Sequence, residues 1–246
     1  MIFNKKKETN SVIIFLHIPK TGGFTLNSII DKQYRGFFDI KGFFDYGWQI
    51  PLADYINSIG DIKKLEVLRG HLFFGAHNHI PQKNYNYITL LRAPVERVVS
   101  EYYFIRRWKN NRPLLQAVKK MTLHEFVTKK EYNGITSNRQ TLMIAGQYDL
   151  AKAKYNLEKH FSIVGITERF DETLYVLEKK LGWKINKYKK ENETKNRPSI
   201  DEIDHDTIEI IREKNQKDIE LYKFANELLD NQLKQLKNSF FAEIMC

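Results

Sequence analysis

The sequence holds 246 residues, of which 42% are hydrophobic and 13% aromatic. A chain this rich in apolar and aromatic side chains is not disordered, and its length suits one α/β domain spanning residues 1–246. The single cysteine excludes an internal disulfide framework and a thiolate metal site within one chain. The formal net charge of +10 predicts an anionic partner, such as a nucleotide, an anionic glycan, a nucleic acid or a membrane surface.

The amino-terminal region contains an apolar run of only six residues, at 12–17. This run is shorter than the core of a signal peptide and far shorter than a membrane span. The near absence of cysteine fits a reducing compartment. We therefore expect a cytoplasmic protein with no membrane span.

Buried strands alternate with helical patterns along the chain. The run VIIFLH at 12–17 reads as a buried parallel strand that ends in a tight turn, and apolar residues at helical spacing follow over 24–30. This alternation predicts a central parallel sheet flanked by helices. Further strands are expected at 65–69, 86–91 and 161–166, and further helices near 94–108, 122–130, 138–145, 149–158, 170–181, 204–229 and 231–241. Residues 34–60 are predicted to be a loop-rich aromatic insertion, and residues 184–199 a basic loop.

The segment HIPKTGGFT, residues 17–25, lies between the first strand and the first helix. Its glycines let the backbone approach an anion, while amides at the helix start and the ammonium of Lys20 supply positive charge. In the P-loop of nucleotide triphosphatases a Lys and a Ser or Thr follow the second glycine. Here Lys20 precedes both glycines, so magnesium is not implied. The alternative is a plain Gly-Gly turn with a surface lysine.

A second segment, LLRAPVERVVSEYYF at 90–104, places Arg92 at the end of a strand and Pro94 at the start of a helix. Arg92 then points into the crevice at the carboxyl edge of the sheet, where Ser100 can join it in gripping a second phosphate. For Arg97 we expect a surface salt bridge with Glu96 or Glu101.

These two segments together resemble the sulfotransferase superfamily, and most closely its heparan sulfate 2-O-sulfotransferase-like branch with bacterial relatives. The resemblance implies a P-loop-like three-layer fold. It also implies 3′-phosphoadenosine 5′-phosphosulfate as donor, adenosine 3′,5′-bisphosphate as product, and no metal. Residues implied to bind the 5′-phosphosulfate are Lys20, Thr21, Gly22, Gly23, Phe24 and Thr25, and those implied to bind the 3′-phosphate are Arg92 and Ser100.

The segment RGHLFFG places His71 after another predicted strand, and in the resembling branch a histidine here acts as general base. A neutral imidazole can take the proton of an acceptor hydroxyl, while Lys20 offsets charge on the leaving nucleotide. A histidine merely hydrogen-bonded in a polar seam is the alternative. Lower-ranked candidates for contacts with the acceptor are His77, Asn138, Arg139 and Gln140. Lys195 and Arg197 are candidates on a basic loop that could close over the 3′-phosphate.

The sequence thus predicts a sulfotransferase that acts on a hydroxyl of a carbohydrate or a small molecule, with no nucleic acid partner. Two alternatives remain at this stage. The first is a P-loop-type nucleotide kinase, and the second is a non-catalytic binder of anionic polymers, which the positive charge alone would also suit.

Overall fold

A five-stranded sheet forms the centre of the computed structural model, which describes residues 11–40, 56, 62–81, 84–109, 112–189, 191 and 197–244. Its strands lie in the order β2-β3-β1-β4-β5, and every neighbouring pair is parallel. This arrangement confirms the predicted α/β class with a central parallel sheet. The strands are β1 Ser11–Leu16, β2 Phe37–Ile40, β3 Val67–Gly70, β4 Asn84–Leu91 and β5 Phe161–Ile166.

Strand β1 lies in the middle of the sheet, with β3 on one side and β4 on the other. Because all strands are parallel, the carboxyl ends Leu16, Gly70 and Leu91 meet at one edge. The strand order reverses about β1, and ligands of open α/β sheets bind in the crevice at such a switch point. The segments that follow β1, β3 and β4 therefore converge on one crevice.

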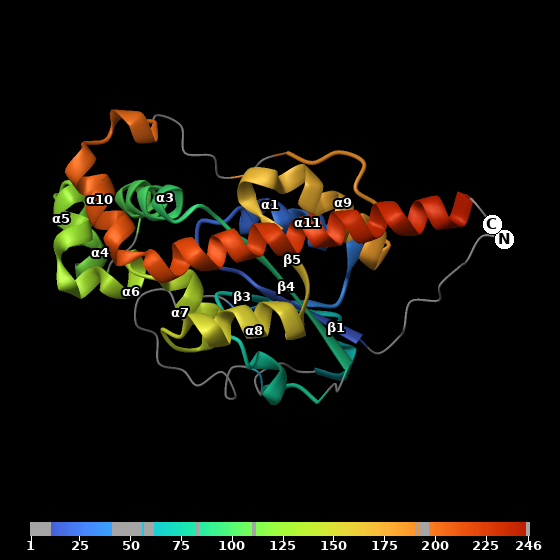
Figure 1. The fold of residues 1–246 in the computed structure, drawn as a ribbon. Coiled ribbons are helices and arrows are strands. Elements are labelled where there is room, and N and C mark those ends of the chain that lie inside the picture. The colour runs from blue at the N-terminus through green and yellow to red at the C-terminus, as the bar shows by residue number, and fades with distance from the viewer. Residues whose placement is uncertain are drawn as a thin grey trace.

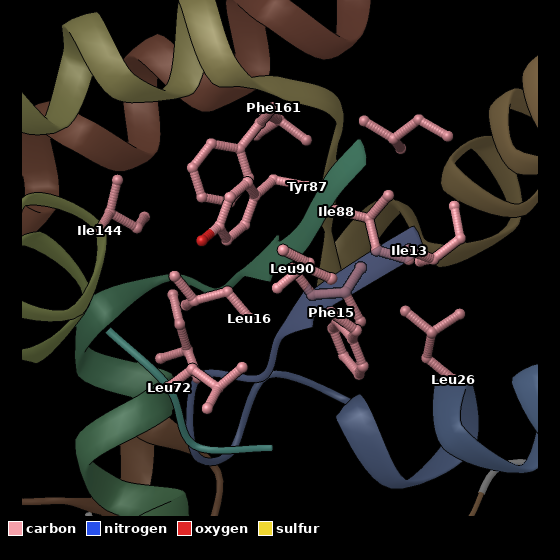
Figure 2. Close-up of a cluster of buried hydrophobic side chains, with 14 of the residues drawn as sticks. Ile13, Phe15, Leu16, Leu26, Leu72, Tyr87, Ile88, Leu90, Ile144 and Phe161 are labelled. Carbon is pink, nitrogen blue, oxygen red and sulfur yellow. The ribbon is translucent and has the colours of Figure 1, made fainter. Parts of the chain in front are cut away.

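Both faces of β1 are buried, which explains its unbroken apolar sequence. Figure 2 shows Ile13 and Phe15 on the face toward Leu26 of the first helix. On the other face, Tyr87 packs against Phe161, with their ring centroids 5.1 Å apart. The central strand is thus fixed from two sides, and so is the turn that leaves its carboxyl end.

The helices form the outer layers of the fold. In Figure 1, α1 and α9 lie on one side of the sheet and α7 and α8 on the other, while α11 runs along the β5 edge between α9 and α8. The helices are α1 Gly23–Gln33, α3 Pro94–Arg107, α4 Pro113–Val118, α5 Leu123–Thr128, α6 Asn133–Thr136, α7 Arg139–Ala145, α8 Leu150–His160, α9 Phe170–Leu181, α10 His205–Lys214 and α11 Gln216–Ile244.

A second hydrophobic cluster joins α3, α4, α5, α6 and α10 beyond the carboxyl end of β4 (Figure 1). Its fully buried members include Val98 of α3, Phe126 of α5 and Ile211 of α10. This cluster fixes α3, which carries Ser100 of the second motif and begins two residues after Arg92. Within the described ranges, no helix is both long and apolar enough to cross a membrane.

Several elements differ from the sequence-based expectation. Strand β2 lies inside the predicted loop-rich insertion, whose residues 41–55 and 57–61 fall outside the described part of the chain. The short helices α4 and α6 were not expected. The helix expected over 204–229 is broken at Asn215, whose buried side-chain amide donates to the carbonyl oxygens of Thr136 and Ile211. Its second part, α11, continues without a break through the separate helix expected at 231–241. The described part of 184–199 contains no helix or strand, as predicted.

Candidate active site

The glycine turn connects β1 to α1 in a tight and partly strained conformation. Gly22 adopts φ 83° and Lys20 φ 69°, a region that a residue with a side chain rarely occupies. The Thr21 hydroxyl donates to the Ile18 carbonyl oxygen at 2.8 Å. This hydroxyl therefore stabilises the turn, whereas we had expected it to face a phosphosulfate oxygen.

The first turn of α1 is prepared for an anion. It contains no acidic residue, and the amides at the start of a helix have no partner within the helix. Gly23 lets the start of α1 pack closely on the His17 ring. A Cβ at position 23 would lie under 3.0 Å from three atoms of that ring. The Thr25 hydroxyl oxygen accepts a hydrogen bond from the Glu191 amide at 2.9 Å, so the basic loop reaches the same turn.

Lys20 extends from the turn into a pocket between β1 and α3. Its Nζ lies 4.1 Å from the centroid of the Phe104 ring. Burial lowers the pKa of Lys20 below its usual value; Arg92 and Arg197 add to this effect and Glu101 opposes it. The ammonium is thus partly desolvated, which strengthens its interaction with negative charge in the pocket.

Two histidines meet in the lining of this pocket. The rings of His17 and His71 lie edge to face with centroids 4.6 Å apart. His17 is 5% exposed, and its burial, followed by His71, Lys20 and Arg69, lowers its pKa well below 6.5. The structure therefore places His71 beside a neutral imidazole and in the same pocket as Lys20. His17 was not among the predicted site residues, although it opens the HIPKTGG motif.

The pocket itself has a volume of about 180 Å³. Three aromatic side chains, Phe24, Phe104 and Trp108, contribute to its walls, and the rings of Phe104 and Trp108 stack with centroids 5.6 Å apart. Sequence reasoning had not assigned Glu101, Phe104 or Trp108 to a site. Their spacing of three and four residues along one helix face was the available signal. The complete lining is His17, Pro19, Lys20, Phe24, His71, Glu101, Phe104 and Trp108.

Arg92 lies beside the glycine turn. Its Nη1 donates to the carbonyl oxygen of Lys20 at 3.1 Å, which joins two motifs that are 72 positions apart. Its Nη2 lies 3.3 Å from the Glu96 carboxylate, and Arg197 pairs with the same carboxylate at 2.5 Å. Ser100 follows Glu96 by one helical turn and therefore lies on the same side of α3.

Arg97 differs from its expected surface position. It is fully buried, and its Nη2 donates to the carbonyl oxygen of Ile135 at 2.7 Å. The expected ion pair with Glu101 is present at 3.8 Å, but both partners are buried. Arg97 therefore connects α3 to the end of α6 inside the protein.

The three polar residues at the start of α7 are not in the pocket lining. The Asn138 side chain accepts from the Asp218 amide at 3.1 Å, and Arg139 donates to the Gly134 carbonyl oxygen at 2.6 Å. Gln140 holds the backbone of Arg92 from both sides: its Oε1 accepts from the Arg92 amide at 3.0 Å and its Nε2 donates to the Arg92 carbonyl oxygen at 2.9 Å. Gln140 thus supports the arginine and does not line this pocket.

His77 also lies away from the pocket. Its Nδ1 is 3.0 Å from the Tyr87 hydroxyl, and its ring stacks on Tyr85 near the amino end of β4. The carboxyl edge of the sheet is at the other end of that strand. Lys195 lies outside the described residues. Among the side chains that the structure describes, no three His, Cys, Asp or Glu residues gather as a metal site would.

The comparison with protein families agrees with this geometry. A model of the sulfotransferase family matches residues 6–225. The chain belongs to the sulfotransferase family.

Similar proteins carry names from heparan sulfate modification. Heparan-sulfate 6-O-sulfotransferase 2 of Danio rerio is 30% identical over 89% of this chain and 58% of that relative. Heparan-sulfate 6-O-sulfotransferase 1 of Gallus gallus is 29% identical over 92% of this chain and 67% of that relative. A heparin sulfate O-sulfotransferase of Drosophila melanogaster is 30% identical over 71% of this chain and 57% of that relative. These matches support the superfamily, and the first two are named for 6-O-transfer, so the 2-O-sulfotransferase-like branch is not confirmed.

Proposed function

We propose that this protein transfers a sulfuryl group from 3′-phosphoadenosine 5′-phosphosulfate to a hydroxyl of a carbohydrate acceptor. The observation that carries the proposal is the 3.1 Å hydrogen bond from Arg92 Nη1 to the Lys20 carbonyl oxygen. It brings the arginine of the second motif to the glycine turn of the first. A nucleotide with a 3′-phosphate and a 5′-phosphosulfate needs cationic groups at two points, and the approach of Arg92 to the turn that carries Lys20 supports this proposal.

The residues present fit such a donor. At one end, the first turn of α1 offers backbone amides and Lys20 without any acidic side chain. At the other end, Arg92 and Arg197 share one carboxylate and so form a pair that suits a phosphate. The donor would supply a sulfuryl group bonded to a phosphate oxygen. The nucleotide phosphate leaves readily when that bond breaks.

The remaining chemistry falls to side chains of the pocket. His71 takes the proton of the acceptor hydroxyl as its oxygen forms a bond to sulfur. The bond from sulfur to the bridging oxygen breaks, and its electron pair stays on adenosine 3′,5′-bisphosphate, where Lys20 stabilises the charge. The aromatic walls of Phe24, Phe104 and Trp108 exclude water and suit the apolar face of a sugar ring.

The names of the relatives suggest a more specific acceptor, a heparan-type glycan that is modified at a 6-hydroxyl. Mapping the sulfated position in the product of such a glycan separates 6-O-transfer from 2-O-transfer. Location in the cytoplasm stays a prediction, which fractionation of expressing cells would test.

The activity test uses sulfur-labelled donor and a panel of desulfated heparan-type glycans, other sugars and small alcohols. We expect label on at least one carbohydrate, and we expect Lys20→Ala and His71→Asn each to lower kcat by about 10²- to 10⁴-fold. The control is His79→Asn, because His79 is exposed and does not line the pocket. If no acceptor is labelled and Lys20→Ala binds adenosine 3′,5′-bisphosphate as wild type does, the proposal is wrong.

Calorimetry separates the two alternatives. A kinase would bind ATP with magnesium more tightly than adenosine 3′,5′-bisphosphate without metal. A non-catalytic binder would bind polyanions in a strongly salt-dependent way with no affinity for either nucleotide.

A further inference from the structure

The Glu96 carboxylate lies between the guanidinium groups of Arg92 and Arg197. One oxygen, Oε2, accepts from Arg92 Nη2 at 3.3 Å and from Arg197 Nη2 at 2.5 Å. Arg197 is also tied to the backbone of Glu96, since its Nη1 donates to the Glu96 carbonyl oxygen at 3.3 Å. A single anionic oxygen shared by two guanidiniums is the arrangement that a bound phosphate oxygen would adopt.

Arg92 does not depend on Glu96 for its position. Its backbone amide and carbonyl are both bonded to Gln140, and its Nη1 donates to the Lys20 carbonyl oxygen. Its Nε lies 3.8 Å from the Glu168 carboxylate, which is itself held by the Ala93 amide and the Tyr222 hydroxyl. Groups other than Glu96 therefore hold the Arg92 guanidinium in place on several sides.

The two arginines repel each other across this contact. Burial lowers the pKa of Arg92 below its usual value, Arg197 lowers it further, and Glu168 and Glu96 oppose the shift. Glu96 thus provides negative charge that offsets the repulsion between the two cations. It lies in the first turn of α3, where the helix dipole also favours a carboxylate, and its side chain is 29% exposed.

We propose that Glu96 sets the affinity of the donor site: its carboxylate occupies the position of the 3′-phosphate and must give up both arginines when a nucleotide binds. This inference rests on the proposed function. A phosphate carries more negative charge than one carboxylate and can displace it, whereas a nucleotide without a 3′-phosphate leaves the contact intact. Part of the attraction between the arginines and the phosphate is offset by the loss of Glu96, so the bisphosphate product is released more easily.

The test compares two nucleotides that differ in the 3′-phosphate. Calorimetry on the full chain measures the Kd of adenosine 3′,5′-bisphosphate and of adenosine 5′-monophosphate for wild type and Glu96→Gln. We expect the bisphosphate to bind about three- to tenfold more tightly to Glu96→Gln, and the monophosphate to bind equally to both proteins. Glu96→Asp keeps the charge at the helix start but shortens the side chain, and we expect a smaller increase in affinity.

The matched control is Glu209→Gln, which removes the same charge from an exposed Glu–Arg pair with Arg212 on α10. It should leave both affinities as in wild type, and thermal unfolding verifies that each variant is folded. Unchanged or weaker binding of the bisphosphate to both Glu96 variants overturns the inference. So does an equal gain for the monophosphate, since the effect would then lie outside the 3′-phosphate position. If wild type binds neither nucleotide, the proposed donor is wrong and this inference falls with it.

Discussion

The His17 imidazole lies directly against the Cα of Gly23, at the start of α1. His17 follows the last residue of β1, and its ring also stacks on Phe15 of that strand, with centroids 5.3 Å apart. The glycine turn is therefore packed on a side chain that the central strand positions. One contact therefore positions both the amino end of α1 and the His17 ring.

Replacing Gly23 by alanine should disrupt this contact. The new methyl group would overlap the His17 ring, which cannot move away because Phe15 and His71 flank it. We expect a loss of about 1–3 kcal/mol in the free energy of unfolding, and a larger loss in nucleotide affinity because the first turn of α1 shifts. Chemical denaturation and calorimetry measure the two quantities.

Gly134→Ala is the matched control for that change. Gly134 lies in α6 with nothing within 4 Å of a Cβ built on it, so alanine should fit there without strain. If Gly23→Ala binds the nucleotide as tightly as wild type does, the glycine turn tolerates the added methyl group and the prediction is wrong.

Much of the sheet was predictable because its strands are buried on both faces and read as continuous apolar runs. Strand β2 was not, since FFDI does not alternate and its pairing is provided by β3. The break between α10 and α11 was also hidden. It depends on Asn215, which donates to the Thr136 carbonyl oxygen of a helix 79 positions earlier.

The candidate site likewise contains residues whose place the sequence predicts and residues whose place it does not. Lys20, His71 and Arg92 were predictable because each follows a strand in a recognisable motif, and parallel strands bring such positions together. The roles of Glu96 and Gln140 were not predictable. A glutamate in the first turn of a helix usually serves the helix dipole alone, and only the fold shows that Arg197 reaches it from the basic loop.

Acid should destabilise the protein partly through His17. Burial holds the pKa of His17 well below 6.5, its value in the unfolded chain, so the unfolded state binds more protons once the pH falls below about 6.5. The free energy of unfolding should therefore decrease as the pH falls below that value, by up to about 1.4 kcal/mol per pH unit from this residue. His17→Gln should show a shallower decrease.

Denaturant titrations at several pH values between 7 and 5 measure that slope. His205→Gln, at an exposed histidine on α10, is the control for the loss of an imidazole. Identical slopes for wild type and His17→Gln would mean that His17 does not carry the linkage.

Gln140 should control donor binding without touching the donor. Gln140→Leu keeps the size of the side chain but leaves the amide and carbonyl of Arg92 without these partners in a buried setting. We expect a loss of about 1–3 kcal/mol in the free energy of unfolding and a several-fold rise in the KM for donor. The KM for acceptor should stay unchanged, since Gln140 does not line the pocket.

Gln147→Leu provides the comparison, because Gln147 is exposed just beyond the end of α7. Steady-state kinetics with each substrate varied in turn gives both KM values. If Gln140→Leu raises only the KM for acceptor, then Gln140 does not act on donor binding through Arg92.

Trp108 should act on the acceptor and not on the donor. Its ring stacks on Phe104 at the end of α3 and lines the pocket, whereas Arg92 and Arg197 contact Glu96 at the start of that helix. Aromatic surface of this kind contributes binding energy mainly through burial, so Trp108→Ala should raise the KM for a carbohydrate acceptor by about 10-fold. The Kd of adenosine 3′,5′-bisphosphate should remain within twofold of wild type. Tyr155→Ala removes an exposed ring from α8 and should change neither value. If Trp108→Ala weakens nucleotide binding and leaves the acceptor KM unchanged, this pocket belongs to the donor, and the acceptor must approach from another side.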